Sequence, residues 1–129
     1  MRTIEPTILY FGTPVALVTT WHEDGTANIG PISALWALGW TLILGLEATA
    51  KTLGNLKREG ECVINLASEE LAAQVEKLAP LTGNAVVPAH KADCFRFEAD
   101  KFGAAGLTPA ASARVRPPRI AECGLQLEA

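Results

Sequence analysis

Short apolar and β-branched runs, separated by turn residues, divide the first half of the chain into strands. Four such runs are predicted as strands, at residues 15–21, 26–38, 40–46 and 62–66. Asp24 and Gly25 predict a tight turn between the first two, and Gly39 separates the second from the third. Gly30 and Pro31 would interrupt a fully paired central strand, so we expect the second run at an edge or a bulge.

Two helices are predicted beside these strands. Leu53 and Leu56 lie three residues apart, as on one face of a short helix, and Gly60 marks its end. Ser68 is the predicted N-cap of a second helix, which Pro80 terminates. The buried stripe of that helix would consist of Leu71, Val75 and Leu78.

The second half of the chain is less regular. Residues 82–118 are rich in Gly, Ala and Pro and predict a long excursion with one or two helical turns, a length that usually has a functional reason. A last strand is predicted from Arg119 onward, and its open edge favours a homodimer. The pattern predicts one domain over residues 1–129, mainly β with helices (α+β): a small β-barrel with helical covers.

Size and charge exclude several classes of function. The chain has 129 residues, enough for one domain with a core and too few for two. The formal net charge is −3 and there is no basic stripe, so we expect no nucleic-acid partner. The apolar segment at residues 33–46 is too short and broken to span a membrane, and Glu5 and Pro6 do not fit a signal peptide. We expect a cytoplasmic protein.

The cysteines and histidines form no metal-binding pattern. Cys62, Cys94 and Cys123 are widely spaced, without a Cys-x-x-Cys pair, and His22 and His90 lie in unrelated segments. We therefore expect no metal, free thiols in a reducing compartment, and histidines that are solvated and have no acid–base role.

Polar residues gather at the start of the first predicted helix. The free N–H groups of a helix start attract anions, and Lys51 and Thr52 would add a positive charge and a hydroxyl. Asn55 shares their helical face, so a phosphate would fit there. The alternative is that Thr49 only caps the helix and Lys51 faces solvent. The P-loop pattern is absent, so a nucleoside triphosphate is not indicated.

A second candidate stretch is ANIGPISALWALGW, residues 27–40. Asn28, the Gly30-Pro31 break and Ser33 expose backbone and small polar groups beside bulky Trp36 and Trp40. Such a surface could hold a planar, hydrogen-bonding ring against the main chain. The alternative is that the tryptophans belong to the core.

Taken together, these stretches resemble a known family. The segments that carry the resemblance, in order, are NIGPISALWALGW, LGL, AKTLGNLKREGECVINL, KLAPLTG, DKFGAAGLTP and PPRIAEC. They are similar to the flavin reductase and flavoredoxin group, whose members are FMN-binding split β-barrels. Members of that group continue past the strand that begins at Arg119, so the resemblance implies a barrel that is short at its C-terminal end.

The resemblance also implies which residues contact FMN. The residues implied for the isoalloxazine ring are Asn28, Ile32, Ser33, Ala34 and Trp36. Those implied for the phosphate end are Thr49, Ala50, Lys51, Thr52 and Asn55. Lys91, from the excursion, would reach the flavin from the other side. No catalytic residue is indicated.

The resulting hypothesis is an NAD(P)H-dependent FMN reductase or a flavoredoxin-like electron carrier that works as a homodimer. Hydride would pass from the nicotinamide to the flavin, so the protein would need only to bind, orient and exclude water. The alternative is a non-catalytic FMN-binding protein that keeps the barrel and has lost turnover. No dinucleotide fingerprint is present to favour NADH over NADPH.

Overall fold

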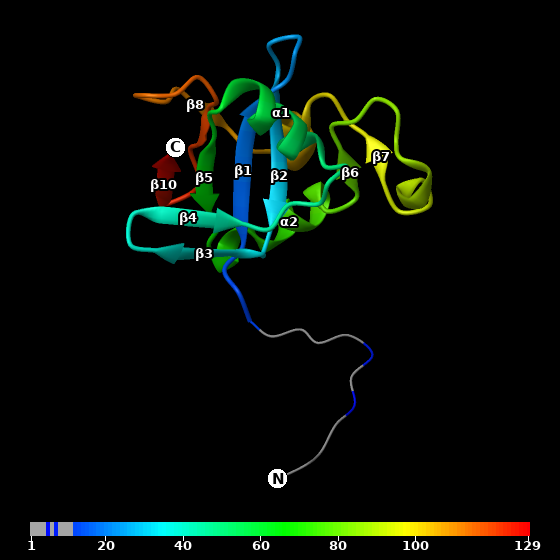
Figure 1. Cartoon of the computed structure of the whole chain (residues 1–129), viewed down its shortest axis with the longest axis horizontal. Coiled ribbons are helices and arrows are strands. Elements are labelled where there is room, and N and C mark those ends of the chain that lie inside the picture. Colours follow the sequence, from blue (N-terminus) through cyan, green and yellow to red (C-terminus); the bar gives the residue numbers. More distant parts are fainter. Residues whose placement is uncertain (1–4, 6, 8–11) are drawn as a thin grey trace.

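A four-stranded antiparallel sheet forms the centre of the computed structural model, which describes residues 5, 7 and 12–129 (Figure 1). The strand order is β10-β5-β1-β2. The strands are β1 (Ala16–Trp21), β2 (Ala27–Ile32), β5 (Val63–Leu66) and β10 (Leu125–Glu128). β2 is therefore an edge strand, as its Gly30-Pro31 dipeptide predicts, because an edge tolerates the missing N–H of proline.

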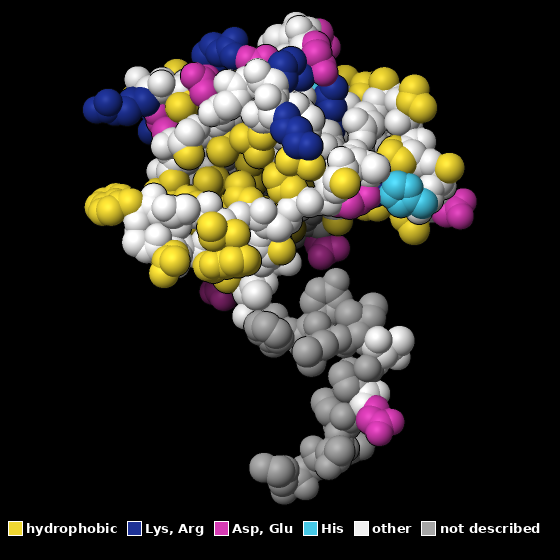
Figure 2. All heavy atoms as spheres, in the orientation of Figure 1, with side chains coloured by type: hydrophobic (Ala, Val, Ile, Leu, Met, Phe, Trp, Pro, Cys, Tyr) yellow, Lys and Arg dark blue, Asp and Glu magenta, His cyan; other side chains and the backbone are white. Residues whose placement is uncertain are grey.

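The two faces of the sheet bury separate clusters of apolar side chains. Alternation along β1 sends Leu17 into one cluster and Ala16 and Val18 into the other. The Leu17 cluster also contains Ile29, Leu71, Leu78, Phe102 and Ile120. The cluster of Ala16 and Val18 also contains Cys62 and Ile64, with partly buried leucines around it. In Figure 2, hydrophobic side chains gather in the hollow above the β3–β4 hairpin.

The β3–β4 hairpin is a separate two-stranded sheet that crosses one end of the main sheet (Figure 1). It consists of β3 (Leu35–Leu38) and β4 (Thr41–Leu44). The predicted strand at residues 40–46 is shorter than expected, because Gly39, with φ +60°, and Trp40 form the turn between Leu38 and Thr41. The hairpin leaves the side chains of Trp36, Leu38 and Trp40 exposed, so the alternative that the two tryptophans belong to the core is wrong.

Both predicted helices are present. α1 (Lys51–Glu59) ends at Gly60, whose φ of +71° suits a glycine C-cap. The second begins as the 3-10 turn η1 (Glu69–Leu71) and continues as α2 (Ala72–Leu78). Ser68 occupies the predicted cap position, but its side chain makes no capping hydrogen bond. Of the predicted stripe, Leu71 and Leu78 are buried and Val75 is partly buried against the same cluster.

The excursion contains more regular structure than the sequence predicts. A short strand, β6 (Leu81–Thr82), leads into it. The elements that follow are η2 (Ala89–Lys91), β7 (Arg96–Phe97), α3 (Lys101–Ala105) and β8 (Pro109–Ala110). The side chain of Asp100 accepts a hydrogen bond from the Gly103 N–H at the start of α3, which explains why a helix begins there. β6 and β7 form a parallel pair.

The single final strand predicted from Arg119 is wrong, because the segment forms two strands. β9 (Arg119–Ile120) pairs with β8, and β10 pairs with β5. The chain turns between them, where the Cys123 N–H donates to the Ile120 carbonyl at 3.1 Å. The side-chain amide of Gln126 donates to both of these residues' carbonyls and so holds the turn.

A buried amide connects this turn to the main sheet. Asn65 is fully buried, and its Nδ2 donates to the Leu17 carbonyl at 2.9 Å. Its Oδ1 accepts from the Ile120 N–H, also at 2.9 Å. Thr19 adds a second connection, since its hydroxyl donates to the Pro118 carbonyl at 2.5 Å. The final segment therefore depends on polar side chains of β1 and β5.

The three cysteines are free thiols in different environments. Cys62 and Cys123 are buried, and Cys94 is exposed. Burial raises the pKa of both buried thiols, that of Cys123 to about 11 with a further contribution from Glu122. Among the described residues no group of His, Cys, Asp and Glu could hold a metal ion. The same part of the chain contains no helix of the length and apolarity that a membrane crossing requires.

Candidate functional site

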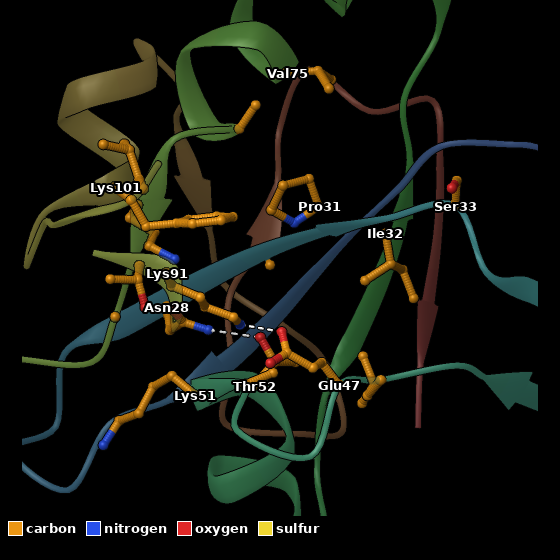
Figure 3. Close-up of a pocket in the computed structure, with 18 of the residues that line it drawn as sticks. Asn28, Pro31, Ile32, Ser33, Glu47, Lys51, Thr52, Val75, Lys91 and Lys101 are labelled. Atoms are coloured by element: carbon orange, nitrogen blue, oxygen red, sulfur yellow. Dashed lines mark hydrogen bonds and ion pairs between the residues drawn. The ribbon is translucent and has the colours of Figure 1, made fainter. Parts of the chain in front are cut away.

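A cavity of about 440 Å³ lies beside the exposed edge of β2 (Figure 3). Its size falls within the roughly 300–1,000 Å³ of small-molecule sites. One wall consists of Asn28, Gly30, Pro31 and Ile32 of β2 and of Ser33, which follows the strand. The loop from β4 into α1 forms the second wall, and the excursion forms the third with Gly83, Lys91, Phe95 and Lys101.

The start of α1 opens onto this cavity. Ala50 is the N-cap residue, so no side chain caps the first N–H groups of the helix. Lys51 and Thr52 follow, and both line the cavity. Uncapped N–H groups together with the helix dipole favour an anion at this end. The first turn contains no acidic residue that would already supply that charge.

Asn28 and Thr52 join β2 to the start of α1 at the floor of the cavity. Nδ2 of Asn28 donates to Thr52 Oγ1 at 3.1 Å, shown as a dashed line in Figure 3, and to Thr20 Oγ1 at 3.3 Å. Asn28 is fully buried, yet its Oδ1 has no hydrogen-bond partner in the described part of the chain. A buried acceptor without a partner is costly, so a ligand that donates a hydrogen bond there would satisfy it.

Gly30 allows β2 and α1 to approach each other closely. A Cβ on residue 30 would overlap Thr52 Oγ1, the atom that Asn28 holds. Thr52 is only 5% exposed and cannot swing away freely. The glycine that the sequence pattern assigned to a strand interruption therefore also makes room for a hydroxyl at the cavity floor.

We predict that Gly30→Ala lowers the free energy of unfolding by about 1–3 kcal/mol, the usual cost of overpacking a closed site. Adding Thr52→Ala removes Oγ1 and leaves Thr52 Cβ, at 3.4 Å, as the nearest atom. The double variant should then be more stable than the sum of the two single effects implies. Urea denaturation of the four proteins measures this coupling.

Gly54→Ala is the matched control, because a Cβ there meets no atom within 4 Å and the residue lies within α1. It should leave stability unchanged or raise it by about 0.5–1 kcal/mol, owing to the higher helix propensity of alanine. Strict additivity of Gly30→Ala and Thr52→Ala would contradict the proposed contact.

Three lysines are among the described residues that line the cavity, and two of them form ion pairs. Lys51 Nζ lies 2.7 Å from Glu23 Oε2, and Lys91 Nζ pairs with Glu47 Oε2. The hydrogen bond from Lys51 lowers the pKa of Glu23 to about 2. Lys91, followed by Thr49 and His90, lowers the pKa of Glu47 to about 2. The third lysine, Lys101, is 4% exposed and donates to the Ile29 carbonyl at 2.8 Å.

The sequence model of a protein family, described as "Flavin reductase like domain", matches residues 8–129 of this chain. The chain belongs to the flavin reductase-like family. YdfE, an uncharacterized protein of Bacillus subtilis (strain 168), is 45% identical over 129 residues, which cover 99% of this chain and 62% of YdfE.

Solved structures give the same fold at low identity. Flavoredoxin of Desulfovibrio vulgaris (Miyazaki F) matches with a TM-score of 0.78 and 20% identity, over 99% of this chain and 64% of its own. Nitrilotriacetate monooxygenase component B from Bacillus cereus matches with a TM-score of 0.69 and 22% identity, over 99% and 66%. The flavin reductase-like chain thus spans less than two thirds of each of these relatives. The likeness confirms the split-barrel fold, which is mainly β with helices.

Most of the site residues that the sequence predicted for this flavin reductase-like chain line the same cavity. Those that line it are Asn28, Ile32, Ser33, Ala50, Lys51, Thr52 and Lys91. They come from β2, the start of α1 and the excursion, so three segments far apart in the sequence meet here. Figure 3 shows Lys91 reaching across toward Glu47.

Four expected site residues lie outside the cavity wall. Trp36 is 59% exposed on β3, and Ala34 is exposed before that strand, where its carbonyl accepts from the Gly45 N–H. Thr49 is exposed and donates to Glu47 instead of capping α1. Asn55 is fully buried and donates to Thr20 Oγ1, which also accepts from Asn28. Asn55 therefore contacts a residue that holds Asn28 and does not line the cavity itself.

Several cavity residues were not predicted from the sequence. Glu47 and Lys101 lie in segments whose folding the hydrophobic pattern did not resolve. Gly83 lies against the floor, where a Cβ would be 2.7 Å from Asn28 Oδ1. The one available signal was the segment DKFGAAGLTP, part of the resemblance. It contains Lys101 but does not indicate that this side chain reaches the cavity.

His22 is a correction to the expectation of solvated histidines. It is buried, and burial followed by the Lys51 charge lowers its pKa, so the neutral imidazole is favoured. His90 is exposed, and its Nε2 lies 3.0 Å from Glu47 Oε1. Neither ring lines the cavity.

Proposed function

We propose that this flavin reductase-like chain binds FMN in the cavity beside β2. The observation that carries the proposal is the buried Asn28 Oδ1, which lies next to the start of α1; among the described residues the first has no hydrogen-bond partner and the second no side-chain cap. FMN has an anionic phosphate at one end and a ring with N–H and carbonyl groups at the other. The cavity presents an anion-binding helix start at one point and a strand edge with a free acceptor beside it.

The residues of the chain would hold FMN in the following way. The phosphate would accept from the N–H groups at the start of α1 and from Lys51, which would exchange its Glu23 partner for the phosphate. The ring would lie along the β2 edge from Asn28, whose Oδ1 would accept from a ring N–H, to Ser33, with Lys91 and Phe95 of the excursion over it. The apolar stems of these residues would exclude water from the ring.

We further propose that the chain acts as an NAD(P)H-dependent flavin reductase or as a flavoredoxin-like electron carrier. A bound flavin would supply the chemistry: it can take up hydride from a reduced nicotinamide and release electrons to an acceptor. The protein then needs only to orient the two rings and keep water out, so the proposal assigns no acid–base role to any side chain.

The expected result is a yellow protein after incubation with FMN, with a flavin spectrum that NADH or NADPH bleaches in the absence of oxygen. Dithionite is the control, since it should bleach any bound flavin. A spectrum that dithionite bleaches and neither nucleotide changes would favour the non-catalytic binding protein. Failure to retain FMN through gel filtration at micromolar protein would contradict the proposed function.

A homodimer is the second part of the proposal. Trp36, Leu38 and Trp40 on the β3–β4 hairpin are 59%, 75% and 107% exposed, and large apolar side chains exposed together on one hairpin are typical of an interface. Leu125 and Leu127 on the edge strand β10 are also exposed. A second copy packed through a two-fold axis would cover the same hairpin on both chains.

We therefore predict that light scattering gives a dimer at micromolar concentration. Replacing both Trp36 and Trp40 by Ser should shift it to a monomer, because tryptophans typically contribute most of the binding energy of an interface. Val86→Ser, which removes an 87% exposed apolar side chain from the excursion, is the matched control and should stay dimeric. A monomeric unmodified chain would refute this part of the proposal.

A further inference from the structure

Lys101 occupies an unusual position for a lysine. It lies in α3, yet only 4% of it is exposed, and its Nζ donates to the Ile29 carbonyl at 2.8 Å on the edge strand β2. An ammonium group has three N–H donors, and the described residues supply one acceptor here. Lys101 is one of the residues that line the cavity.

Lys101 also differs from the other two cavity lysines in that its charge is not paired with a carboxylate of the described residues. Of the lysines that line the cavity, Lys51 and Lys91 pair with Glu23 and Glu47. Lys101 pairs with no carboxylate in the described part of the chain. Burying an unpaired charge is unfavourable, so a structure that does so beside a cavity indicates an anionic or carbonyl-bearing ligand.

We propose that Lys101 contacts the cofactor directly, donating from its ammonium group to the carbonyl-bearing pyrimidine edge of the bound flavin. This inference rests on the proposed function. It assigns the ring and not the phosphate, because α3 and the start of α1 pack on opposite faces of β2: Ile29 packs with Phe102 of α3, and Asn28 bonds Thr52 of α1. Figure 3 shows Lys101 on one side of the β2 ribbon and Lys51 and Thr52 on the other. The start of α1 already provides for the phosphate on the latter side.

A positive charge at that edge would do more than orient the ring. The pyrimidine part of a flavin becomes electron-rich on reduction, so a nearby ammonium favours the reduced form and raises the reduction potential. Lys101 would thus bind the ring and adjust its chemistry through the same contact.

The interaction should depend on pH because Lys101 must be protonated to carry the charge. Burial lowers its pKa to about 8, and Glu98 opposes that shift. The other charged groups that face this region are His22, Lys51 with Glu23, and Lys91 with Glu47. The pKa values of His22, Glu23 and Glu47 are lowered, away from pH 7–9. Flavin affinity should therefore fall as the pH rises through about 8.

The test compares Lys101→Met and Lys101→Arg with the unmodified chain. Dissociation constants for FMN and riboflavin are measured from pH 7 to 9, with the reduction potential of bound FMN at pH 7. Lys101→Met should weaken both flavins by the same factor, about 10- to 100-fold, as for a lost charge-assisted hydrogen bond. It should also lower the potential and remove the pH dependence. Lys101→Arg, which stays charged, should retain affinity across this range.

Thermal melts of the ligand-free variants separate binding from folding, because Lys101 also holds the Ile29 carbonyl. Binding is compared at a temperature at which all three proteins are folded. Weaker FMN binding with unchanged riboflavin binding would move the contact to the phosphate and overturn the inference. Unchanged affinity and potential in Lys101→Met would leave Lys101 a structural residue and also overturn it. An unmodified chain that binds neither flavin would refute the proposed function, and this inference with it.

Discussion

Asn65→Leu is expected to lower the free energy of unfolding by about 2–4 kcal/mol, the largest effect on stability that we predict for a single substitution. The leucine would fill a similar volume but leave the Ile120 N–H and the Leu17 carbonyl without the partners they have at 2.9 Å. Both groups are buried between the main sheet and β9, where water cannot replace the amide. Urea denaturation monitored by circular dichroism measures the change.

The matched control is Asn84→Leu, the same substitution at a partly exposed amide that donates to the Thr49 carbonyl. Water can replace that hydrogen bond, so stability should change by less than about 0.5 kcal/mol. Amide exchange gives a local measurement, since the Ile120 N–H should lose protection in the Asn65 variant before the centre of β1 does. Equal stabilities of the two variants would show that Asn65 is not the connection we describe.

The largest effect on binding is expected from Lys51→Ala combined with Thr52→Ala. This double variant should weaken FMN by about 2–4 kcal/mol, since it removes a charge and a hydroxyl beside the helix start. Riboflavin has no phosphate and should bind to the variant and to the unmodified chain with similar affinity. Flavin fluorescence titrations measure both constants.

Two further proteins make this test specific. Thr52→Ser keeps the hydroxyl that accepts from Asn28, so it should retain FMN binding and show that the floor of the cavity is intact. Glu23→Gln removes the carboxylate that holds Lys51 and should preserve or strengthen FMN binding. If the unmodified chain bound FMN and riboflavin equally well, the phosphate would not lie at the start of α1.

The parts of the fold that the sequence predicted are those governed by local pattern. β1, α1 and β5 follow from β-branched runs, a short apolar stripe and a terminal glycine, and each lies within two residues of its predicted bounds. The Gly30-Pro31 break predicted an edge or a bulge, because proline lacks the N–H that a central strand needs, and the structure places β2 at the edge.

The parts that were missed depend on contacts distant in sequence. The final segment alternates like one strand, and only the Gln126 and Asn65 side chains show where it must turn. In the site, local chemistry located Asn28, Lys51 and Thr52. It did not reveal that Lys101 would donate to the carbonyl of Ile29, 72 residues earlier in the chain, or that Glu47 would pair with Lys91. Trp36, which the resemblance implied for the ring, is exposed on the hairpin outside the cavity wall, and its contact with the ring stays a prediction.

The unequal environments of the three cysteines have a practical consequence for experiments on this chain. Alkylating reagents attack the thiolate, so Cys62 and Cys123, buried and with raised pKa values, should react slowly. Cys94 is exposed and directly precedes Phe95, which lines the cavity. A maleimide fluorophore should therefore attach at Cys94 without engineering, next in sequence to a residue of the cavity wall. Its emission would report movement of the excursion as ligands enter, in real time and in the natural sequence.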